Sequence, residues 1–141
     1  MSTRTAHARW EGTLKDGTGE IDFGNGRFKE PYSFASRFEA GAGTNPEELL
    51  GAAHAGCFAM ALSLTLSEAG FKPDSIDATA HVAVSPREGG FKITQSRIVC
   101  EAKVSGIDEA QFSKYAAQAK SGCPVSQALS GIEIILEAKL R

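Results

Sequence analysis

The chain has 141 residues, of which 42% are hydrophobic and 23% are charged, and its formal net charge is -2. This composition fits a single globular domain with a hydrophobic core, which we take as residues 1–141. The charge balance gives no support to nucleic-acid binding or to attachment to an anionic membrane. No apolar run at the N-terminus resembles a secretory signal, and three cysteines do not make a disulfide framework, so we expect a cytoplasmic protein.

The N-terminal part of the chain reads as strands separated by glycine-containing turns. Residues 7–14 and 18–23 predict two strands of a hairpin, joined by a turn at Asp16-Gly17, where positive φ is tolerated. Residues 32–38 alternate aromatic or small side chains with polar ones, which predicts a third strand.

A long helix is predicted over residues 46–69. Thr44 or Asn45 can cap its start, proline and acidic residues follow in the first turn, and Gly70 can take the left-handed conformation beyond its end. Roughly 24 residues at 1.5 Å per residue give a helix about 36 Å long. We therefore expect this helix to be the centre of the fold.

The circumference of this helix is almost entirely apolar. Between Glu48 and Glu68 the only ionisable side chains are His54 and Cys57. A membrane span is one interpretation, but the flanks carry glutamates instead of basic or aromatic anchors, and amphipathic strands lie on both sides. We expect instead that a second copy of the helix covers the face that the sheet leaves open, in a two-fold dimer.

The C-terminal half predicts two strands, two helices and a final strand. Residues 76–84 and 91–104 read as a hairpin, residues 108–120 as an amphipathic helix, and a short helix restarts after Cys123. Residues 132–140 read as the last strand. This order predicts an α+β domain with a largely antiparallel sheet around a long central helix.

The three cysteines occupy different settings. Cys57 lies in mid-helix, where a buried thiol is usually a small hydrophobic group. Cys123 precedes Pro124 and is therefore at the N-cap of a helix, where free amides and the helix dipole stabilise a thiolate. Cys100 lies within a strand pattern, with no base or cap nearby, and we interpret it as structural.

A metal site is a weaker interpretation of the same residues. His54 and Cys57 are three residues apart on one helix and could share an ion. The other candidate ligands, His7, His81 and Cys123, are scattered, without the paired spacings of a zinc site. We expect no metal, and we interpret His54 as a packing histidine at a helix interface.

Four motifs resemble those of the osmotically inducible protein C (OsmC) family, and the chain is also similar to the sister branch of organic hydroperoxide resistance proteins. The motifs are Arg37-Phe38-Glu39, Gly43-Thr44-Asn45-Pro46-Glu47-Glu48-Leu49, Ala52-Ala53-His54-Ala55-Gly56-Cys57-Phe58-Ala59-Met60 and Gly122-Cys123-Pro124-Val125-Ser126. The resemblance implies an OsmC-like fold, as an intertwined homodimer with two active sites at its interface. It implies a thiol-dependent peroxidase that reduces organic hydroperoxides, and hydrogen peroxide less well. It further implies no cofactor (neither metal, haem nor flavin) and an external dithiol reductant, such as a lipoylated protein.

The resemblance also implies a role for four residues. Cys57 is the peroxidatic cysteine, Cys123 the resolving cysteine, and Arg37 with Glu47 the pair that activates Cys57. The chemistry fits these roles, because a buried thiol becomes a nucleophile only beside a cation, and a guanidinium held by a carboxylate supplies one. Attack on the peroxide gives a sulfenic acid, which a nearby thiol converts to a disulfide.

Helix geometry bears on how these residues meet. Ten residues of continuous helix separate Glu47 from Cys57 by about 15 Å along the axis. We therefore expect each site to combine the two cysteines of one chain with Glu47, and Arg37, of its partner.

Two other classes of function remain open on the residues alone. Phe34, Phe38 and Phe58 could line a pocket for a small apolar ligand, with the thiols incidental, or the chain could be a purely structural dimer.

Overall fold

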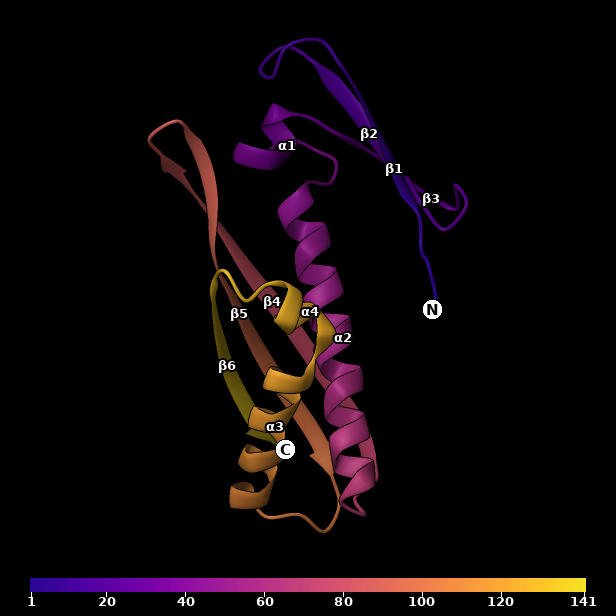
Figure 1. Ribbon diagram of the computed structural model, residues 1–141, viewed down its shortest axis with the longest axis vertical. Helices are drawn as coiled ribbons and strands as arrows, with labels where there is room; N and C mark the ends of the chain where they lie inside the picture. Colours follow the sequence, from indigo (N-terminus) through magenta and orange to yellow (C-terminus); the bar gives the residue numbers. More distant parts are fainter. The chain divides into compact units, whose positions relative to one another are not determined.

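The computed structural model describes residues 1–141, which form an α+β protein, as expected. The elements in chain order are β1 (Ala6–Glu11), β2 (Thr18–Phe23), β3 (Phe28–Tyr32), α1 (Phe34–Phe38), α2 (Pro46–Glu68), β4 (Pro73–Arg87), β5 (Gly90–Val104), α3 (Glu109–Gly122), α4 (Pro124–Ala128) and β6 (Glu133–Leu140) (Figure 1). The chain forms two compact units, Met1–Leu49 and Leu50–Arg141, each of which is described by itself.

The first unit contains a three-stranded antiparallel sheet in the order β1-β2-β3. Gly19 of β2 lies opposite Trp10 on one side and Tyr32 on the other. The two rings approach to 5.2 Å between centroids, and a Cβ atom at Gly19 would lie 2.5 Å from each of them. Glycine is therefore required here so that the two aromatic rings can meet across the strand.

The prediction of a third strand at residues 32–38 is wrong, because residues 34–38 form helix α1. A capping box begins this helix: the Ser33 hydroxyl accepts from the N–H of Ser36, and the Ser36 hydroxyl accepts from the N–H of Ser33. Phe34 and Phe38 are four residues apart and pack with ring centroids at 5.0 Å. Their spacing fits a helical face as well as a strand, and the cap decides between the two.

Helix α2 forms at the predicted position. The side-chain oxygen of Asn45 accepts from the N–H of Glu48 at 2.8 Å, so Asn45 is the N-cap. At the other end Gly70 has φ 90°, and the N–H of Phe71 donates to the carbonyl of Leu66 at 2.9 Å. This is the glycine-terminated helix end that the sequence predicts.

The second unit contains the other sheet, in the order β4-β5-β6. Strands β4 and β5 form the predicted antiparallel hairpin, whereas β6 pairs parallel to β5. This second sheet is thus mixed, but strand pairing in the protein is largely antiparallel, as predicted, because the pairs β1-β2, β2-β3 and β4-β5 are all antiparallel. Helices α3 and α4 form the crossover between β5 and β6, and a crossover of this kind is what a parallel pair requires.

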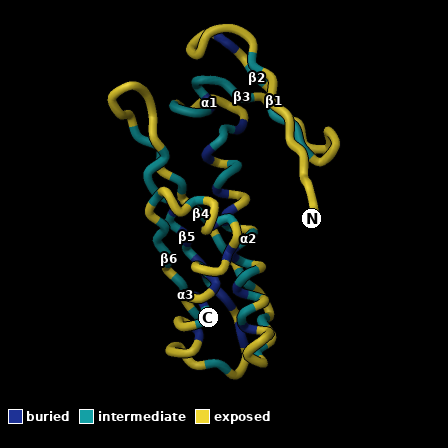
Figure 2. Tube along the Cα trace, viewed as in Figure 1, coloured by how far each residue is buried: buried dark blue, intermediate teal, exposed yellow.

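The core of the second unit lies between α2, β5 and α3, as the buried segments in Figure 2 show. Phe58, Leu62 and Leu66 are spaced four residues apart and form one buried stripe of α2. The stripe packs against alternate residues of β5 and against α3, through Ile98, Cys100, Ala102, Val104, Phe112, Ala116 and Ala119. Because Cys57 adjoins Phe58, this packing fixes the position of Cys57 at the border of the core.

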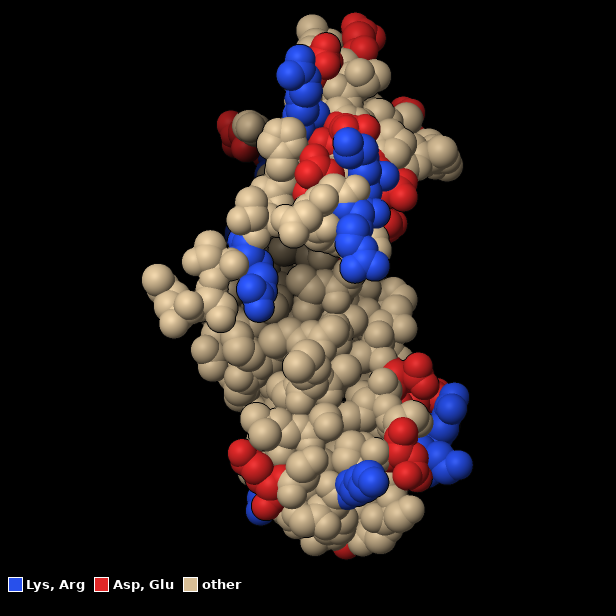
Figure 3. Space-filling view, turned by 90° about the vertical axis from the view of Figure 1, so that its right-hand side faces the viewer, with Lys and Arg blue, Asp and Glu red and all other residues tan.

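The opposite face of α2 is apolar and exposed. Met60 is 77% exposed and Leu64 is 60% exposed. Figure 3 shows the uncharged surface of this region in tan, across the middle of the view. By length and composition α2 is the one helix that could cross a membrane, but its buried stripe belongs to the protein core. An exposed face of this kind on a core helix is typical of a surface that contacts another molecule.

Candidate active site

The structure brings Cys57 and Cys123 together in the second unit. Their Sγ atoms lie 2.9 Å apart, which is within hydrogen-bonding distance of a thiol and a sulfur acceptor. A disulfide requires about 2.05 Å, so the sulfurs need to approach by less than about 1 Å to form one. Cys57 is half-buried and Cys123 is buried, which leaves Cys57 as the more accessible sulfur of the pair.

Two helices that meet at Cys123 hold its backbone in place. Cys123 ends α3, where its N–H donates to the carbonyl of Ala119 at 2.9 Å. It is also the N-cap of α4, with Pro124 in the first turn, and its carbonyl accepts from the N–H of Gln127 at 3.0 Å. The predicted N-cap position of Cys123 is confirmed.

The pKa values of the two thiols shift in opposite directions in this unit. Burial raises the pKa of Cys57, and the hydrogen bond with Cys123 raises it further, against a smaller lowering by the N–H of Val125. Burial also opposes ionisation of Cys123, but hydrogen bonds from the Cys57 thiol, from Ser126 and from the N–H of Val125 lower the pKa of Cys123 below its ordinary value. None of the groups that act on Cys57 here is a cation.

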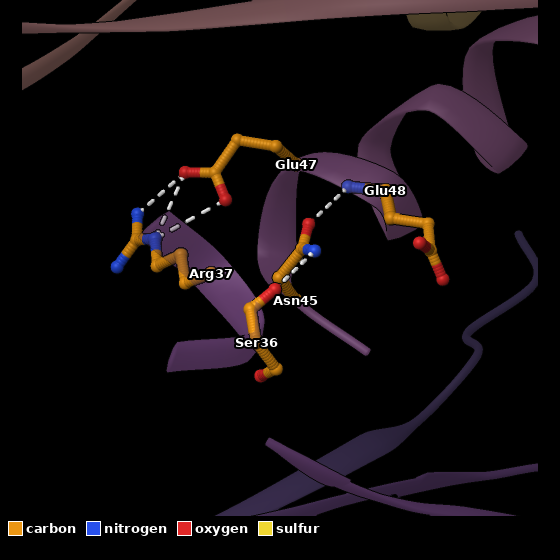
Figure 4. Close-up of polar contacts among 5 residues, drawn as sticks. All are labelled: Ser36, Arg37, Asn45, Glu47 and Glu48. Atoms are coloured by element: carbon orange, nitrogen blue, oxygen red, sulfur yellow. Dashed lines mark hydrogen bonds and ion pairs between the residues drawn. The ribbon is translucent and has the colours of Figure 1, made fainter. Parts of the chain in front are cut away.

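Arg37 and Glu47 form an ion pair in the first unit. Arg37 Nη2 donates to Glu47 Oε1 at 2.7 Å, and Nε lies 3.0 and 3.1 Å from the two carboxylate oxygens (Figure 4). The Glu47 side chain is only 7% exposed, against 32% for Arg37. A carboxylate so well buried is a strong anchor for the guanidinium, because water cannot readily replace the pair.

Hydrogen bonds between α1 and the start of α2 hold this ion pair in place. Ser36 Oγ donates to the carbonyl of Thr44 at 2.7 Å, and Asn45 Nδ2 donates to the carbonyl of Ser36 at 3.0 Å (Figure 4). Asn45 thus caps α2 and binds α1 with the same side chain. Arg37 on α1 and Glu47 on α2 are therefore held relative to each other by these two side-chain-to-carbonyl hydrogen bonds as well as by their own charges.

Beside Arg37 the first unit has a cavity of about 360 Å³. Its lining is mostly aromatic and apolar, with the guanidinium of Arg37 as its charged group. The residues are Trp10, Gly12, Leu14, Tyr32, Ser33, Phe34, Arg37 and Phe38. A pocket of this kind suits a ligand with an apolar body and one polar end.

His54 is completely buried, and both of its ring nitrogens have hydrogen-bond partners. Nδ1 lies 2.7 Å from Ser96 Oγ of β5, and Nε2 lies 2.8 Å from Ser126 Oγ of α4. Burial lowers the pKa of His54, which keeps the ring neutral. This agrees with a packing histidine and leaves no nitrogen free for the metal interpretation. Sequence reasoning did not assign Ser96 or Ser126 a function, although both are polar residues at positions that face the interior.

Cys100 lies apart from this chemistry. It is buried in the middle of β5, and burial, together with the charges of Asp77 and Glu101, raises its pKa to about 11. A thiol with so high a pKa is inert at neutral pH, in agreement with the structural interpretation.

The sequence-predicted residues thus form two pairs. The structure joins Arg37 to Glu47 in the first unit and Cys57 to Cys123 in the second unit.

Comparison with known proteins gives relatives along the whole chain. The family described as OsmC-like protein matches residues 39–137. Peroxiredoxin OsmC of Escherichia coli (strain K12) is 49% identical over 98% of this chain and 96% of its own length. Organic hydroperoxide resistance protein OhrB of Bacillus subtilis (strain 168) is 32% identical over 72% of this chain and 74% of its own length.

Solved structures agree with the fold. The crystal structure of OhrB of Bacillus subtilis has a TM-score of 0.70 at 25% identity and covers 97% of this chain and 98% of that chain. An OsmC like protein from Mycoplasma pneumoniae has a TM-score of 0.75, covering 99% of this chain and 97% of its own. At 15% identity the second comparison concerns the fold alone.

Proposed function

This chain belongs to the OsmC-like protein family, and we propose that it is a thiol-dependent peroxidase that reduces organic hydroperoxides, and hydrogen peroxide less well, through Cys57 and Cys123. The observation that carries the proposal is the separation of 2.9 Å between the two sulfurs, one at the border of the core and one at a helix N-cap. The names of its relatives, a peroxiredoxin and an organic hydroperoxide resistance protein, support the same reaction.

The reaction begins at Cys57, the more exposed thiol of the pair. Its thiolate attacks one peroxide oxygen, so that an S–O bond forms, the O–O bond breaks and the alcohol leaves after taking up a proton. Cys57 is then a sulfenic acid. The Cys123 thiolate attacks that sulfur, a disulfide forms and hydroxide leaves as water after protonation. An external dithiol, such as a lipoyl group carried by another protein, reduces the disulfide and completes the cycle.

Arg37 serves two steps of this cycle. Its guanidinium favours the thiolate of Cys57 and donates hydrogen bonds to the peroxide oxygen that leaves as alkoxide. Glu47 holds the guanidinium fork in orientation through its two carboxylate oxygens. The aromatic cavity beside Arg37 accommodates the apolar part of an organic hydroperoxide, which explains a preference for such substrates over hydrogen peroxide.

Activation of Cys57 requires a cation from outside its own surroundings. Within the second unit, burial and Cys123 raise the pKa of Cys57, and no cation lowers it. Ten residues of α2, about 15 Å along its axis, separate Cys57 from Glu47 of the same chain. The protein is therefore a homodimer in which Arg37 and Glu47 of one chain complete the site at Cys57 and Cys123 of the other.

The uncharged face of α2 is the surface for this dimer. Met60 and Leu64 are the large apolar residues that it exposes. Two such faces packed about a two-fold axis would remove both residues from water and bring the N-terminal end of one helix toward the middle of the other.

A reducing compartment keeps the thiols reduced between turnovers, so we assign the protein to the cytoplasm.

The direct test is peroxide consumption. The purified protein is incubated with cumene hydroperoxide and an excess of dithiol, and the loss of peroxide is followed over many turnovers. We expect catalytic turnover that requires Cys57. A module that only binds apolar ligands in the aromatic cavity, or a structural dimer, would consume no peroxide beyond the buffer control, and that result would refute the proposed function.

Mixing two inactive variants tests the shared site. Cys57→Ser and Glu47→Ala chains are folded together, and the heterodimer is isolated by two different affinity tags. One of its two sites then contains Cys57 and Cys123 of one chain with intact Arg37 and Glu47 of the other. We expect activity to return in the heterodimer, and an inactive heterodimer would place all four residues in one chain.

A further inference from the structure

His54 connects the two helices that carry the active thiols. It precedes Cys57 by three residues on α2, and its Nε2 lies 2.8 Å from the hydroxyl of Ser126 on α4. Residues three apart on a helix lie on neighbouring positions of one face. Ser126 in turn follows Cys123 by three residues, so the contact joins the turn before Cys57 to the first turn after Cys123.

The residues that hold His54 in place are buried. His54 and Ser96 are completely buried and Ser126 is 6% exposed. Nδ1 of His54 lies 2.7 Å from the Ser96 hydroxyl, so the ring is held from β5 on one side and from α4 on the other. All three polar groups find their partners inside the protein, where losing one would leave another unpaired.

The contact with Ser126 is the one that reaches the active thiols. Cys123 is the N-cap of α4, and Ser126 lies three residues later in that helix. The Cys123 sulfur lies 2.9 Å from the sulfur of Cys57. A shift of Ser126 relative to His54 would therefore move Cys123 relative to Cys57.

We propose that His54 and Ser126 are positioning residues for the resolving step, holding Cys123 against Cys57 through their contact between α2 and α4. The inference rests on the proposed function in that the natural oxidant of Cys57 is a peroxide. The network acts when the Cys123 thiolate attacks the oxidised sulfur of Cys57. An S–S bond forms, the group on Cys57 leaves with the electron pair of its bond to sulfur, and the Ser126 proton stays on its own oxygen throughout.

This role differs from that of an ordinary buried hydrogen bond, because only one side of His54 touches the chemistry. Ser126→Ala removes the hydroxyl through which His54 contacts α4, whereas Ser96→Ala removes the same chemical group from the other ring nitrogen. Both variants leave one nitrogen of a buried histidine unpaired, so we expect similar decreases in the midpoint of thermal unfolding. Ser96→Ala is therefore the matched control for the structural effect.

The test compares two rates in single turnovers without reductant. Reduced protein is mixed with cumene hydroperoxide, and mass spectrometry follows the sulfenic acid, trapped with dimedone, and the disulfide. In Ser126→Ala we expect disulfide formation to slow about tenfold relative to sulfenic acid formation, the effect of losing one buried hydrogen bond that holds Cys123 in position. The slowed variant should also accumulate sulfinic acid at Cys57 in excess peroxide. Ser96→Ala should keep the ratio of the parent to within about threefold, since its contact between His54 and Ser126 is intact.

A second measurement separates this inference from the proposed function. A chromogenic aromatic disulfide replaces the peroxide: Cys57 displaces one aromatic thiolate, and attack by Cys123 on the mixed disulfide displaces the second. The delay between the two releases reports the resolving step even if the protein consumes no peroxide. A longer delay in Ser126→Ala than in Ser96→Ala supports the inference, and equal delays overturn it.

Two substitutions of the histidine provide an independent check if Ser126→Ala does not fold. The Asn amide reaches only the place of Nδ1, whereas the Gln amide reaches that of Nε2. His54→Asn should therefore resolve slowly, and His54→Gln should resolve close to the parent rate. Equal rates for the two variants would contradict the inference.

Discussion

Replacing Arg37 with lysine keeps the charge but removes the planar fork, and we expect a large loss of activity. Arg37 contacts Glu47 through Nε and Nη2, with the shortest distance 2.7 Å. A single ammonium group can reproduce one of these two donors. The Glu47 side chain is 7% exposed, so water cannot readily replace the second.

The size of the effect follows from the lost contact. One hydrogen bond between charged groups contributes about 1.5 to 3 kcal/mol. If that energy holds the cation in its working orientation, its loss reduces kcat/KM by about 10- to 150-fold, at 1.36 kcal/mol for each factor of ten.

The assay is the initial rate of cumene hydroperoxide reduction with excess dithiol, at several peroxide concentrations and with the folded fraction measured by circular dichroism. Arg9→Lys is the matched control, because Arg9 forms an exposed ion pair with Glu11 in the same unit. Pairs of that kind contribute little, so this variant should resemble the parent. An Arg37→Lys protein with a rate within about twofold of the parent would show that charge alone is sufficient and would refute the argument from orientation.

Three further predictions concern the thiols and the core. Cys57→Ser should abolish turnover, Cys123→Ser should permit one round of reaction and accumulate sulfenic acid, and Cys100→Ser should leave activity intact. Mass spectrometry after peroxide treatment distinguishes these outcomes. Turnover by Cys57→Ser would show that another residue is the nucleophile. Cys57→Ala should raise the pKa of Cys123, because it removes a thiol that donates to that sulfur, and the thiolate absorbance should therefore grow in at higher pH. An unchanged titration midpoint would contradict the hydrogen bond. Phe58→Ala should lower the free energy of unfolding in urea by about 3 to 5 kcal/mol, because Phe58 is fully buried, and a loss below about 1 kcal/mol would show that the core closes around the missing ring.

Much of the fold could be predicted because it depends on local signals. The long helix has an asparagine cap, acidic residues in its first turn and a glycine end, and it forms as Pro46–Glu68. The helix start at Cys123 follows from the proline after it, and the hairpin of β4 and β5 follows from alternating side chains. Each of these signals acts within a few residues of the chain, so it can be recognised without knowledge of the fold.

One local prediction was wrong because two signals competed. Phe34 and Phe38 suit a strand by their alternation and a helix by their spacing of four. The reciprocal hydrogen bonds of Ser33 and Ser36 favour the helix, and the structure has α1 at this position. The N3 residue of this capping box is Ser36, where glutamate or glutamine is usual, so the motif is a weak signal in the sequence.

The sequence by itself determined the helix ends, the α+β class and the family, and it identified Arg37, Glu47, Cys57 and Cys123 as the residues to examine. It could not show the parallel pairing of β6 with β5, because strand direction depends on how a crossover packs onto a sheet.

Only the tertiary structure decided which side chains meet. His54 lies 42 residues from Ser96 and 72 residues from Ser126, and no spacing rule connects residues so far apart along the chain. The alternation of β5 indicates that Ser96 faces inward with Ile98 and Cys100, but a polar residue at an inward position does not name its partner. Hydrogen bonds act over about 3 Å, so the partner of a buried hydroxyl is fixed only when the packing of the whole core brings it within that distance.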